Sequence, residues 1–320
     1  MSYNIKNWEI MEPRSTRDAY GDALLKIGDN NKIVVLDADL SASTQTSKFA
    51  KAYPERFVDI GCAEQNLIGI AAGFAISGKI PFVSTYAIFS NRAWEQIRNT
   101  VAYDNLNVKI VVSHSGLTNG PDGASHQSLE DIAIMRVIPN MTVIVPSDAI
   151  ETEKVIISEV DRKGPAYIRL NRSKTPIIFD ENYEFKLNEI VKLADGDDIA
   201  IIATGTMVHQ ALESSRILKK ENIDASVFNV HTIKPIDRNA IIDIAKKSGK
   251  IITIEEHSIY GGLGSTIAEI LAEEYIGIGM IGTKDTFGES GEYNQLLKKH
   301  GLTSENIVKF ARHLNKQNRK

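Results

Sequence analysis

Two short stretches of this chain carry residue types that could do chemistry. The first, Gly61-Cys62-Ala63-Glu64-Gln65, lies between a short strand-like segment (57–60) and an apolar helical run (67–76). It places a carboxylate at the start of a helix that looks buried, where a charge is costly unless it is paired or functional. Glu64 is therefore a candidate site residue, and the alternative is a carboxylate that simply favours a helix N-terminus.

The second stretch, residues 113–127, reads SHSGLTNGPDGASHQ and holds two histidines, one aspartate and three glycines. It follows a predicted strand and precedes a predicted helix, so it belongs at the carboxyl edge of a sheet, where open α/β sheets bind ligands. Such a loop packs poorly as core but can present polar groups to a ligand. A long surface loop with incidental histidines is the alternative.

The elements that must position these stretches alternate between apolar strands and helices, which predicts mainly parallel sheets covered by helices. In the first part of the chain we expect strands at 32–36, 81–85, 108–113, 141–145 and 166–170, and helices at 16–26, 64–76, 92–102 and 149–160. A polar stretch at 171–197 reads as a linker or crossing segment. A second series has strands at 199–203, 225–230, 250–254 and 276–281, and helices at 207–221, 239–248, 265–274, 293–300 and 304–315.

Composition narrows the class of protein. The 320 residues, 42% of them hydrophobic, can fill two domains, and a net charge of −4 gives no reason to expect nucleic acid or an anionic membrane as a partner. No window approaches eighteen uncharged apolar residues, and the N-terminal segment lacks the apolar core of a signal peptide. We therefore expect a cytoplasmic globular protein. The one cysteine, Cys62, excludes an internal disulfide and a cysteine metal cluster, and we interpret it as a small buried filler.

The two stretches together resemble the transketolase family of thiamine-diphosphate enzymes. Gly61–Gln65 is similar to the family's G-x-A-E-Q/H motif, and the second stretch carries the family's histidine, D-G pair and second histidine. The resemblance covers nearly the whole chain. It includes Ala38-Asp39-Leu40, then Glu255–Ser258 with Gly261–Gly264, and finally Phe287–Gly291. It implies two consecutive three-layer α/β domains with mainly parallel sheets, a pyrimidine-binding domain at 1–185 and a transketolase C-terminal domain at 186–320.

The family's upstream diphosphate-binding signature, G-D-G followed by a distant asparagine, does not occur in this chain. The resemblance therefore implies the C-terminal subunit of a split transketolase. Its partner would be an N-terminal subunit that carries the diphosphate domain and holds Mg²⁺ or another divalent metal, in an α2β2 assembly. The chain itself should provide no metal ligand and should self-associate.

The resemblance also implies site residues for thiamine diphosphate. Glu64 would bind the ring nitrogen of the cofactor's aminopyrimidine and so promote formation of the reactive carbon nucleophile. Tyr86 and Phe89 would sandwich the pyrimidine ring. Leu40 would pack under the cofactor and help hold its bent shape, and Asp39 would lie at the cofactor and subunit boundary. Arg92 stands where the family has a third aromatic residue, as in deoxyxylulose-phosphate synthases.

For the substrate, the resemblance implies that His114 and His126 line the channel, bind the sugar oxygens and shuttle protons. Asp122 would bind a sugar hydroxyl. The remaining matched positions would bind the sugar phosphate, for which a guanidinium is well suited: Arg17, Ser43 and Arg172. Arg169 lies near the same strand end and is left out of the binding set.

The implied activity is transfer of a two-carbon ketol unit from a ketose phosphate to an aldose phosphate. One alternative is a synthase that decarboxylates pyruvate and joins it to an aldehyde phosphate, which Arg92 favours and His114 opposes. A 2-oxo-acid dehydrogenase beta subunit has a similar length, but the histidine loop argues against it. A non-catalytic scaffold subunit is the third alternative, and the intact set of Glu64, His114, Asp122 and His126 argues against it.

Overall fold

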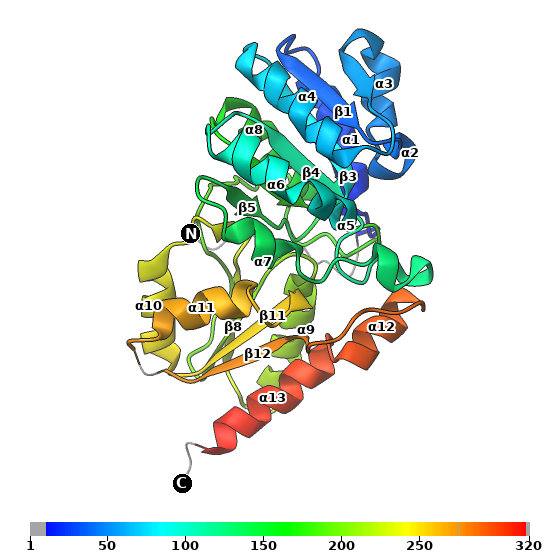
Figure 1. Ribbon diagram of the computed structural model, residues 1–320. Coiled ribbons are helices and arrows are strands. Elements are labelled where there is room, and N and C mark those ends of the chain that lie inside the picture. The colour runs from blue at the N-terminus through cyan, green and yellow to red at the C-terminus, as the bar shows by residue number, and fades with distance from the viewer. Residues whose placement is uncertain (1–10, 275, 318–320) are drawn as a thin grey trace.

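The structure, a computed structural model that describes residues 11–274 and 276–317, is built on two sheets that follow one another along the chain (Figure 1). The strand orders are β10-β5-β6-β4-β3-β1-β2 and β12-β11-β8-β9-β7. Neighbouring strands are parallel except for β10 with β5 and β7 with β9. The expected pair of α/β units with mainly parallel sheets is confirmed. Residues 1–10, which bear on the signal-peptide expectation, lie outside the described part.

The described strands are β1 (Ile33–Asp37), β2 (Phe57–Asp59), β3 (Ile80–Tyr86), β4 (Lys109–Ser113), β5 (Thr142–Ile144), β6 (Ala166–Arg169), β7 (Val191–Ala194), β8 (Ile199–Ala203), β9 (Ala225–Asn229), β10 (Thr232–Lys234), β11 (Ile251–Ser258) and β12 (Ile278–Thr283). All of them lie close to expected positions except β7 and β10, which the sequence did not predict. Strands β1, β3, β4 and β8 are buried at every position. Strands buried on both faces read as unbroken apolar runs, and for this reason the sequence located them well.

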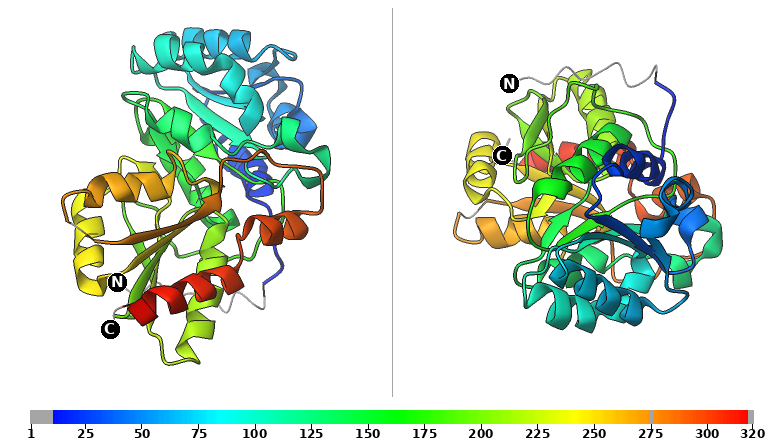
Figure 2. Two further views of the ribbon diagram at one scale, coloured as in Figure 1. Left: turned by 60° about the horizontal axis from the view of Figure 1, so that its bottom comes forward. Right: turned by 90° about the horizontal axis from the view of Figure 1, so that it is seen from above.

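Helices cover both faces of the first sheet (Figures 1 and 2). Side chains along its strands point alternately to two hydrophobic cores, one on each face of the sheet. One core is shared with α4 (Glu64–Ile76), and the other is shared with α1 (Thr16–Ile27) and α8 (Ala149–Asp161). Short helices complete this half: α2 (Ser41–Thr44), α3 (Ser47–Ala52), α5 (Ala87–Ser90), α6 (Trp94–Gln96) and α7 (Asp131–Arg136). Side-chain caps fix two of the long helices, since Ser15 accepts from the Asp18 N–H and Asp148 from the Glu151 N–H.

The second sheet is covered in the same way (Figure 2). On one face lie α10 (Arg238–Ser248) and α11 (Leu263–Leu271), and on the other lie α9 (Met207–Lys219) and α13 (Ser304–Gln317). Helix α12 (Tyr293–His300) follows the loop after β12. One hydrophobic cluster contains residues of both sheets, such as Val83 and Ile202, so the two halves share a continuous core.

Three local features differ from expectation. The stretch 171–197 is not a loose linker, because Ile178, Phe179 and Tyr183 are buried in it and it contains strand β7. Strand β10 comes from the second half of the chain but extends the first sheet. The helix expected at 92–102 is broken into α6 and a π-helical turn at Ile97–Ala102.

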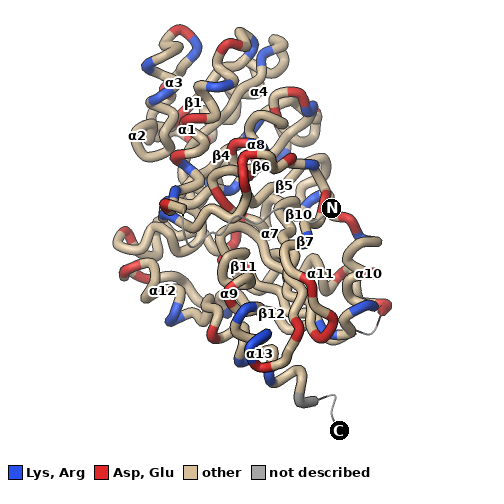
Figure 3. The backbone as a smooth tube through the Cα atoms, turned by 180° about the vertical axis from the view of Figure 1, so that it is seen from behind, with Lys and Arg blue, Asp and Glu red and all other residues tan. Residues whose placement is uncertain are grey.

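Charged residues of both signs are interspersed over the two halves in the view of Figure 3. In the part of the chain that the structure describes, no helix combines the length and apolar character needed to cross a membrane.

Candidate active site

Glu64 is the first residue of α4 and is 8% exposed. The chain reaches it from β2 through Gly61, whose φ of +80° lies in the region that favours glycine. Its carboxylate oxygen Oε2 lies 3.3 Å from the Nε of Arg92, whose side chain is 72% exposed. Glu64 therefore lies at the edge of a pocket of about 420 Å³, lined by Cys62, Ala63, Glu64, Gln65, Asn66 and Arg92.

Cys62 is exposed, which corrects its interpretation as buried filler. Its sulfur lies 3.9 Å from a carboxylate oxygen of Asp39. Cys62 lines the same pocket as Glu64 and is exposed, so a small residue at position 62 is not required by core packing.

An aromatic pair follows at the end of the next strand. Tyr86 ends β3 and Phe89 lies in α5, and their ring centroids are 5.4 Å apart with planes inclined by 8°. This is the spacing of two rings in direct contact. In this conformation the pair therefore offers one aromatic surface rather than a slot for a third ring.

His114 is stacked on the other side of Tyr86, with centroids 3.8 Å apart. It is 1% exposed, has a φ of +58° and makes two polar contacts, one from each ring nitrogen. Nε2 lies 3.1 Å from an Nη of Arg17, and Nδ1 lies 2.8 Å from the Ser113 hydroxyl. Because a guanidinium only donates, Nε2 must be the acceptor and the ring proton belongs on Nδ1.

Burial lowers the pKa of His114 to about 3, and the charges of Arg17, Arg172 and His126 add to this effect. The imidazole is thus neutral at physiological pH. It can accept a proton or a hydrogen bond at Nε2 without first losing one.

His126 reaches the same place from the other end of the loop. Its ring meets Phe89 edge-on, with centroids 5.4 Å apart. Asn119 joins the two ends, because its side-chain amide donates to the His126 carbonyl at 2.7 Å and to the His114 carbonyl at 3.5 Å. The structure therefore brings together both histidines and both aromatic residues that the sequence analysis named.

A cationic group lies beside His114. Arg17, in α1, donates from Nη1 to the Ser43 carbonyl at 2.9 Å, while its buried Nε has no partner among the described residues. Burial lowers the pKa of Arg17, the nearby Arg172 charge lowers it further, and Asp18 opposes the shift. Arg172 itself contacts the Asp122 carboxylate at 3.3 Å. Two close guanidiniums and a free N–H donor suit an anion such as a phosphate.

The corner after β1 carries Asp39 and Leu40. Asp39 is exposed with a φ of +61°, and its N–H donates to Asp59 at 2.9 Å. The fully buried Asp37 shapes this corner by accepting from the Leu40 N–H at 2.6 Å and from the hydroxyls of Thr44 and Thr46. Burial raises the pKa of Asp37 to about 6, and these hydrogen bonds oppose the shift.

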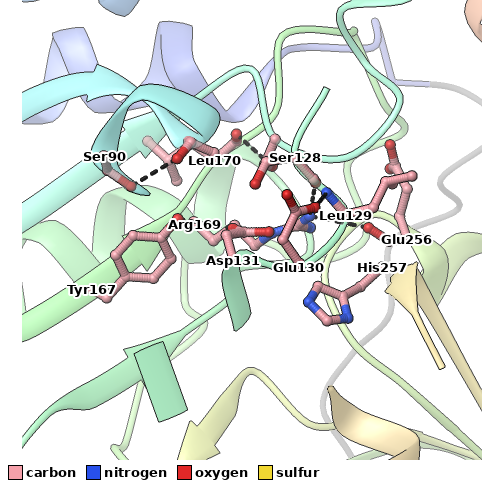
Figure 4. A network of polar contacts seen from close by, with 12 residues as sticks. Ser90, Ser128, Leu129, Glu130, Asp131, Tyr167, Arg169, Leu170, Glu256 and His257 are labelled. Atoms are coloured by element: carbon pink, nitrogen blue, oxygen red, sulfur yellow. Dashed lines mark hydrogen bonds and ion pairs between the residues drawn. The ribbon is translucent and has the colours of Figure 1, made fainter. Parts of the chain in front are cut away.

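Sequence reasoning missed several supporting residues, among them Asp37, Ser113 and Asn119. The available signal for Asp37 was an acid that closes a wholly apolar strand. No pattern marked Ser113 or Asn119, because their partners are the backbone and rings of the folded loop. Arg169, left out of the binding set, is 3% exposed and pairs with the buried Asp131 at 2.8 Å (Figure 4).

Among residues 11–274 and 276–317, no group of three or more His, Cys, Asp or Glu side chains could hold a metal ion.

Comparison with known proteins fits this geometry. Residues 12–177 match the transketolase pyrimidine-binding domain family and residues 188–307 the transketolase C-terminal domain family. A Methanocaldococcus jannaschii protein named for the C-terminal section of transketolase is 50% identical over 303 residues, which are 92% of this chain and 95% of that protein. The 6-deoxy-6-sulfo-D-fructose transketolase subunit SqwH of Clostridium sp. is 42% identical, over 94% of each chain.

A solved structure described as a split gene transketolase, in an inactive β4 tetramer, is similar with a TM-score of 0.86 and 46% identity. The similarity covers 94% of this chain and 98% of that one. The family matches span most of the chain, and these relatives are similar from end to end. The chain therefore belongs to the transketolase family.

Proposed function

We propose that this chain is the C-terminal subunit of a thiamine-diphosphate-dependent transketolase, which transfers a two-carbon ketol unit between sugar phosphates together with an N-terminal subunit. The observation that carries the proposal is the convergence at one edge of the first sheet. There, Glu64 follows β2, the aromatic pair lies at the end of β3, and the neutral His114 with its Arg17 contact follows β4, so these residues share the carboxyl edge of parallel strands.

The residues present fit one end of the cofactor. Glu64 has a shielded carboxylate that can bind a pyrimidine ring nitrogen, and Phe89 offers an aromatic face beside it. When bound, thiamine diphosphate supplies a carbon nucleophile that stabilises the negative charge left by carbon–carbon cleavage. The diphosphate and its Mg²⁺ or other divalent metal would be held by the partner subunit.

The chain's own residues then bind the sugar and move its protons. Arg17 and Arg172 hold the phosphate and so fix the distance of the reacting carbon from the pocket. His114 accepts a hydrogen bond at Nε2, and His126, whose ring meets Phe89 edge-on, moves protons of the sugar. Asp122, already in contact with Arg172, is placed to bind a sugar hydroxyl.

A partner is needed because the pocket that Glu64 lines is bordered by the exposed residues Cys62, Gln65 and Asn66. The exposed residues of α4 continue from this pocket along one stripe, at Gln65, Asn66, Gly69, Gly73 and Ile76. The similar solved structure is named as an inactive tetramer of one chain type, which supports self-association of this chain and a second chain for activity. We infer an α2β2 enzyme in which this stripe faces the N-terminal subunit.

The anion site indicates the class of sugar that we propose as substrate. Two guanidiniums and the Ser43 region suit a terminal phosphate, so we propose phosphorylated sugars as donor and acceptor. SqwH is named for a sulfonated sugar, and a sulfonate is also a tetrahedral anion. Such a sugar is the substrate class to test next.

A second function, the pyruvate-consuming synthase, is favoured by the Arg92 contact with Glu64. That guanidinium could bind the pyruvate carboxylate at the pocket. His114 opposes this reading, because the synthases carry an aspartate at its position.

The test is ketol transfer from xylulose 5-phosphate to ribose 5-phosphate with thiamine diphosphate and Mg²⁺. It is run with the chain alone, with the N-terminal subunit alone and with both. Activity of the mixture only is the expected result. Carbon dioxide release from pyruvate with no ketol transfer would replace the proposal by the synthase.

A further inference from the structure

Glu256, in β11 of the second sheet, reaches into the active-site loop of the first. It is 3% exposed, and its Oε1 accepts a hydrogen bond from the Leu117 N–H at 2.6 Å. The approach is so close that a Cβ on Gly116, which has a φ of +62°, would lie 2.4 Å from the same oxygen. A carboxylate of the C-terminal half thus contacts the backbone two to three residues after His114.

The other oxygen of Glu256 joins three more segments. Oε2 accepts from the Tyr293 hydroxyl at 2.7 Å, from Thr206 at 3.1 Å and from the Asn171 amide at 3.2 Å. Asn171 directly precedes Arg172, and its own side-chain oxygen accepts from Ser115 in the loop at 2.9 Å. One carboxylate therefore holds the histidine loop and the strand end that carries the phosphate-site arginine.

The buried Arg169 lies in the same interface as this carboxylate. Arg169 donates to the Glu256 carbonyl at 3.0 Å and to the Ser128 carbonyl at 3.3 Å, and it pairs with Asp131 (Figure 4). Burial raises the pKa of Glu256, while Arg169 and the donated hydrogen bonds oppose the shift. A buried ionic network adds little net stability compared with apolar packing, so its benefit lies in fixing one arrangement of the segments it joins.

We propose that Glu256 is a positioning residue, through which the C-terminal domain holds His114 and Arg172 in the geometry that binds the sugar phosphate. This inference rests on the proposed function. A hydrogen bond that only joined the two domains would not have to reach the backbone of the histidine loop at 113–127. Glu256 instead bonds the loop backbone, and through Asn171 it bonds the loop a second time at Ser115.

The variant that tests this role is Glu256→Gln. The carboxylate accepts all four of its hydrogen bonds. In the variant an NH2 group would replace one of the two oxygens, and an NH2 group at the position of Oε2 could not accept the hydrogen bonds donated there. Tyr293→Phe removes one of the four and is a milder variant that keeps the buried carboxylate. The matched control is Glu255→Gln. That neighbouring carboxylate is 1% exposed but accepts from the N–H groups of Leu263 and Gly264 at the start of α11.

Two readouts separate positioning from stability. In the chain alone, Glu256→Gln should speed amide hydrogen exchange at 115–118 by about tenfold or more, whereas Glu255→Gln should not. In the reconstituted enzyme, Glu256→Gln should raise the KM for the phosphorylated acceptor by about tenfold or more. Its thiamine-diphosphate affinity should stay unchanged. Tyr293→Phe should move both quantities in the same direction by less.

The proposal would be overturned if Glu256→Gln and Tyr293→Phe both keep the wild-type exchange rate at 115–118 and the wild-type acceptor KM. It would also be overturned if Glu255→Gln changed these two quantities as much as Glu256→Gln does. If Glu256→Gln does not fold, Tyr293→Phe decides alone. A wild-type pair that performs no ketol transfer would contradict the proposed function, even if Glu256→Gln exchanges faster at the loop. It would leave the positioning of the loop supported, because exchange is measured without activity.

Discussion

His114 shows how neighbouring charges set the chemistry of one residue. Its ring is buried against Tyr86, and Arg17 donates to Nε2, so protonation would place a third positive charge among two guanidiniums. The same contacts that keep the ring neutral leave Nε2 beside Arg17, which we propose binds the substrate's phosphate. A residue in this state serves as an acceptor over the whole physiological range.

The first prediction concerns pH. The pKa of His114 is about 3 in the folded chain and 6.5 when unfolded, so between these values the unfolded chain binds more protons. Stability is nearly complete above about pH 7.5 and falls as the pH drops, by up to about 1.4 kcal/mol per unit, or roughly 1.6 kcal/mol from pH 6.5 to 5.0. His114→Asn should lose less of its free energy of unfolding over that range in urea titrations.

Other buried groups with shifted pKa values, such as His231 and Asp148, are present in both proteins, so the difference between wild type and variant isolates position 114. Identical acid dependence of the two proteins would show that His114 is not held neutral.

The second prediction concerns the anion site. Arg17→Gln should raise the KM for a phosphorylated acceptor by about 10- to 100-fold, because it removes a charge-assisted hydrogen bond. The measurement is steady-state ketol transfer at varied acceptor concentration. Arg312→Gln is the control, since that exposed arginine pairs with Glu221 in the C-terminal half. An unchanged KM for Arg17→Gln would remove Arg17 from the phosphate site.

At the scale of elements, helix α4 links the cofactor pocket to an open surface. Its buried residues Leu67, Ile68, Ala71 and Ala72 pack on the first sheet. Its other side exposes Gly69 and Gly73, where an added Cβ would meet nothing within 4 Å, and Ile76, which is 72% exposed. A helix that is apolar all round is normally buried, so this stripe is suited to close contact with another subunit.

The third prediction follows from that stripe. Gly73→Arg should weaken association with the N-terminal subunit by tenfold or more, about 1.4 kcal/mol. The fold of the chain alone should not suffer, because the position is open. Calorimetric titration of one subunit with the other measures the affinity. Gly277→Arg is the control, since Gly277 is also open but precedes β12 in the second sheet. Equal affinities of the two variants would place the partner elsewhere.

The elements also show what the sequence could and could not predict. Buried parallel strands were located from their apolar runs: the run covers all of β8, and in β4 it covers the three residues between Lys109 and Ser113. The short antiparallel strands β7 and β10 were missed, since each is only three or four residues long and is set by its pairing partner. The stretch at 171–197, expected as a linker or crossing segment, does run from β6 of the first sheet to β7 of the second. Its few apolar residues are spread among polar ones, so the sequence did not indicate that they would be buried.

At the scale of the whole molecule, the two halves divide the work. The first sheet and its loops carry every residue that the resemblance named for cofactor and substrate. The second half of the chain reaches the histidine loop through Glu256, and also through the segment before α12, where the Gln127 amide donates to the Glu289 carbonyl at 3.0 Å. The order of the motifs in the sequence predicted that these residues lie in the first half of the chain. The contacts of Glu256 could not be predicted, because the Glu255–Ser258 motif does not reveal its partners and the four donors come from four separate segments. Only the folded interface brings them together.

The central claim is that Glu64 of this chain completes a cofactor site shared with a second subunit. The most direct test is ketol transfer by the reconstituted pair, wild type against Glu64→Ala, at saturating sugar phosphates and cofactor. The account predicts activity for the wild-type pair and a loss of about 10²- to 10⁴-fold for the variant, the range that general acid–base catalysis contributes. A Glu64→Ala pair that transfers ketol units at the wild-type rate would contradict it.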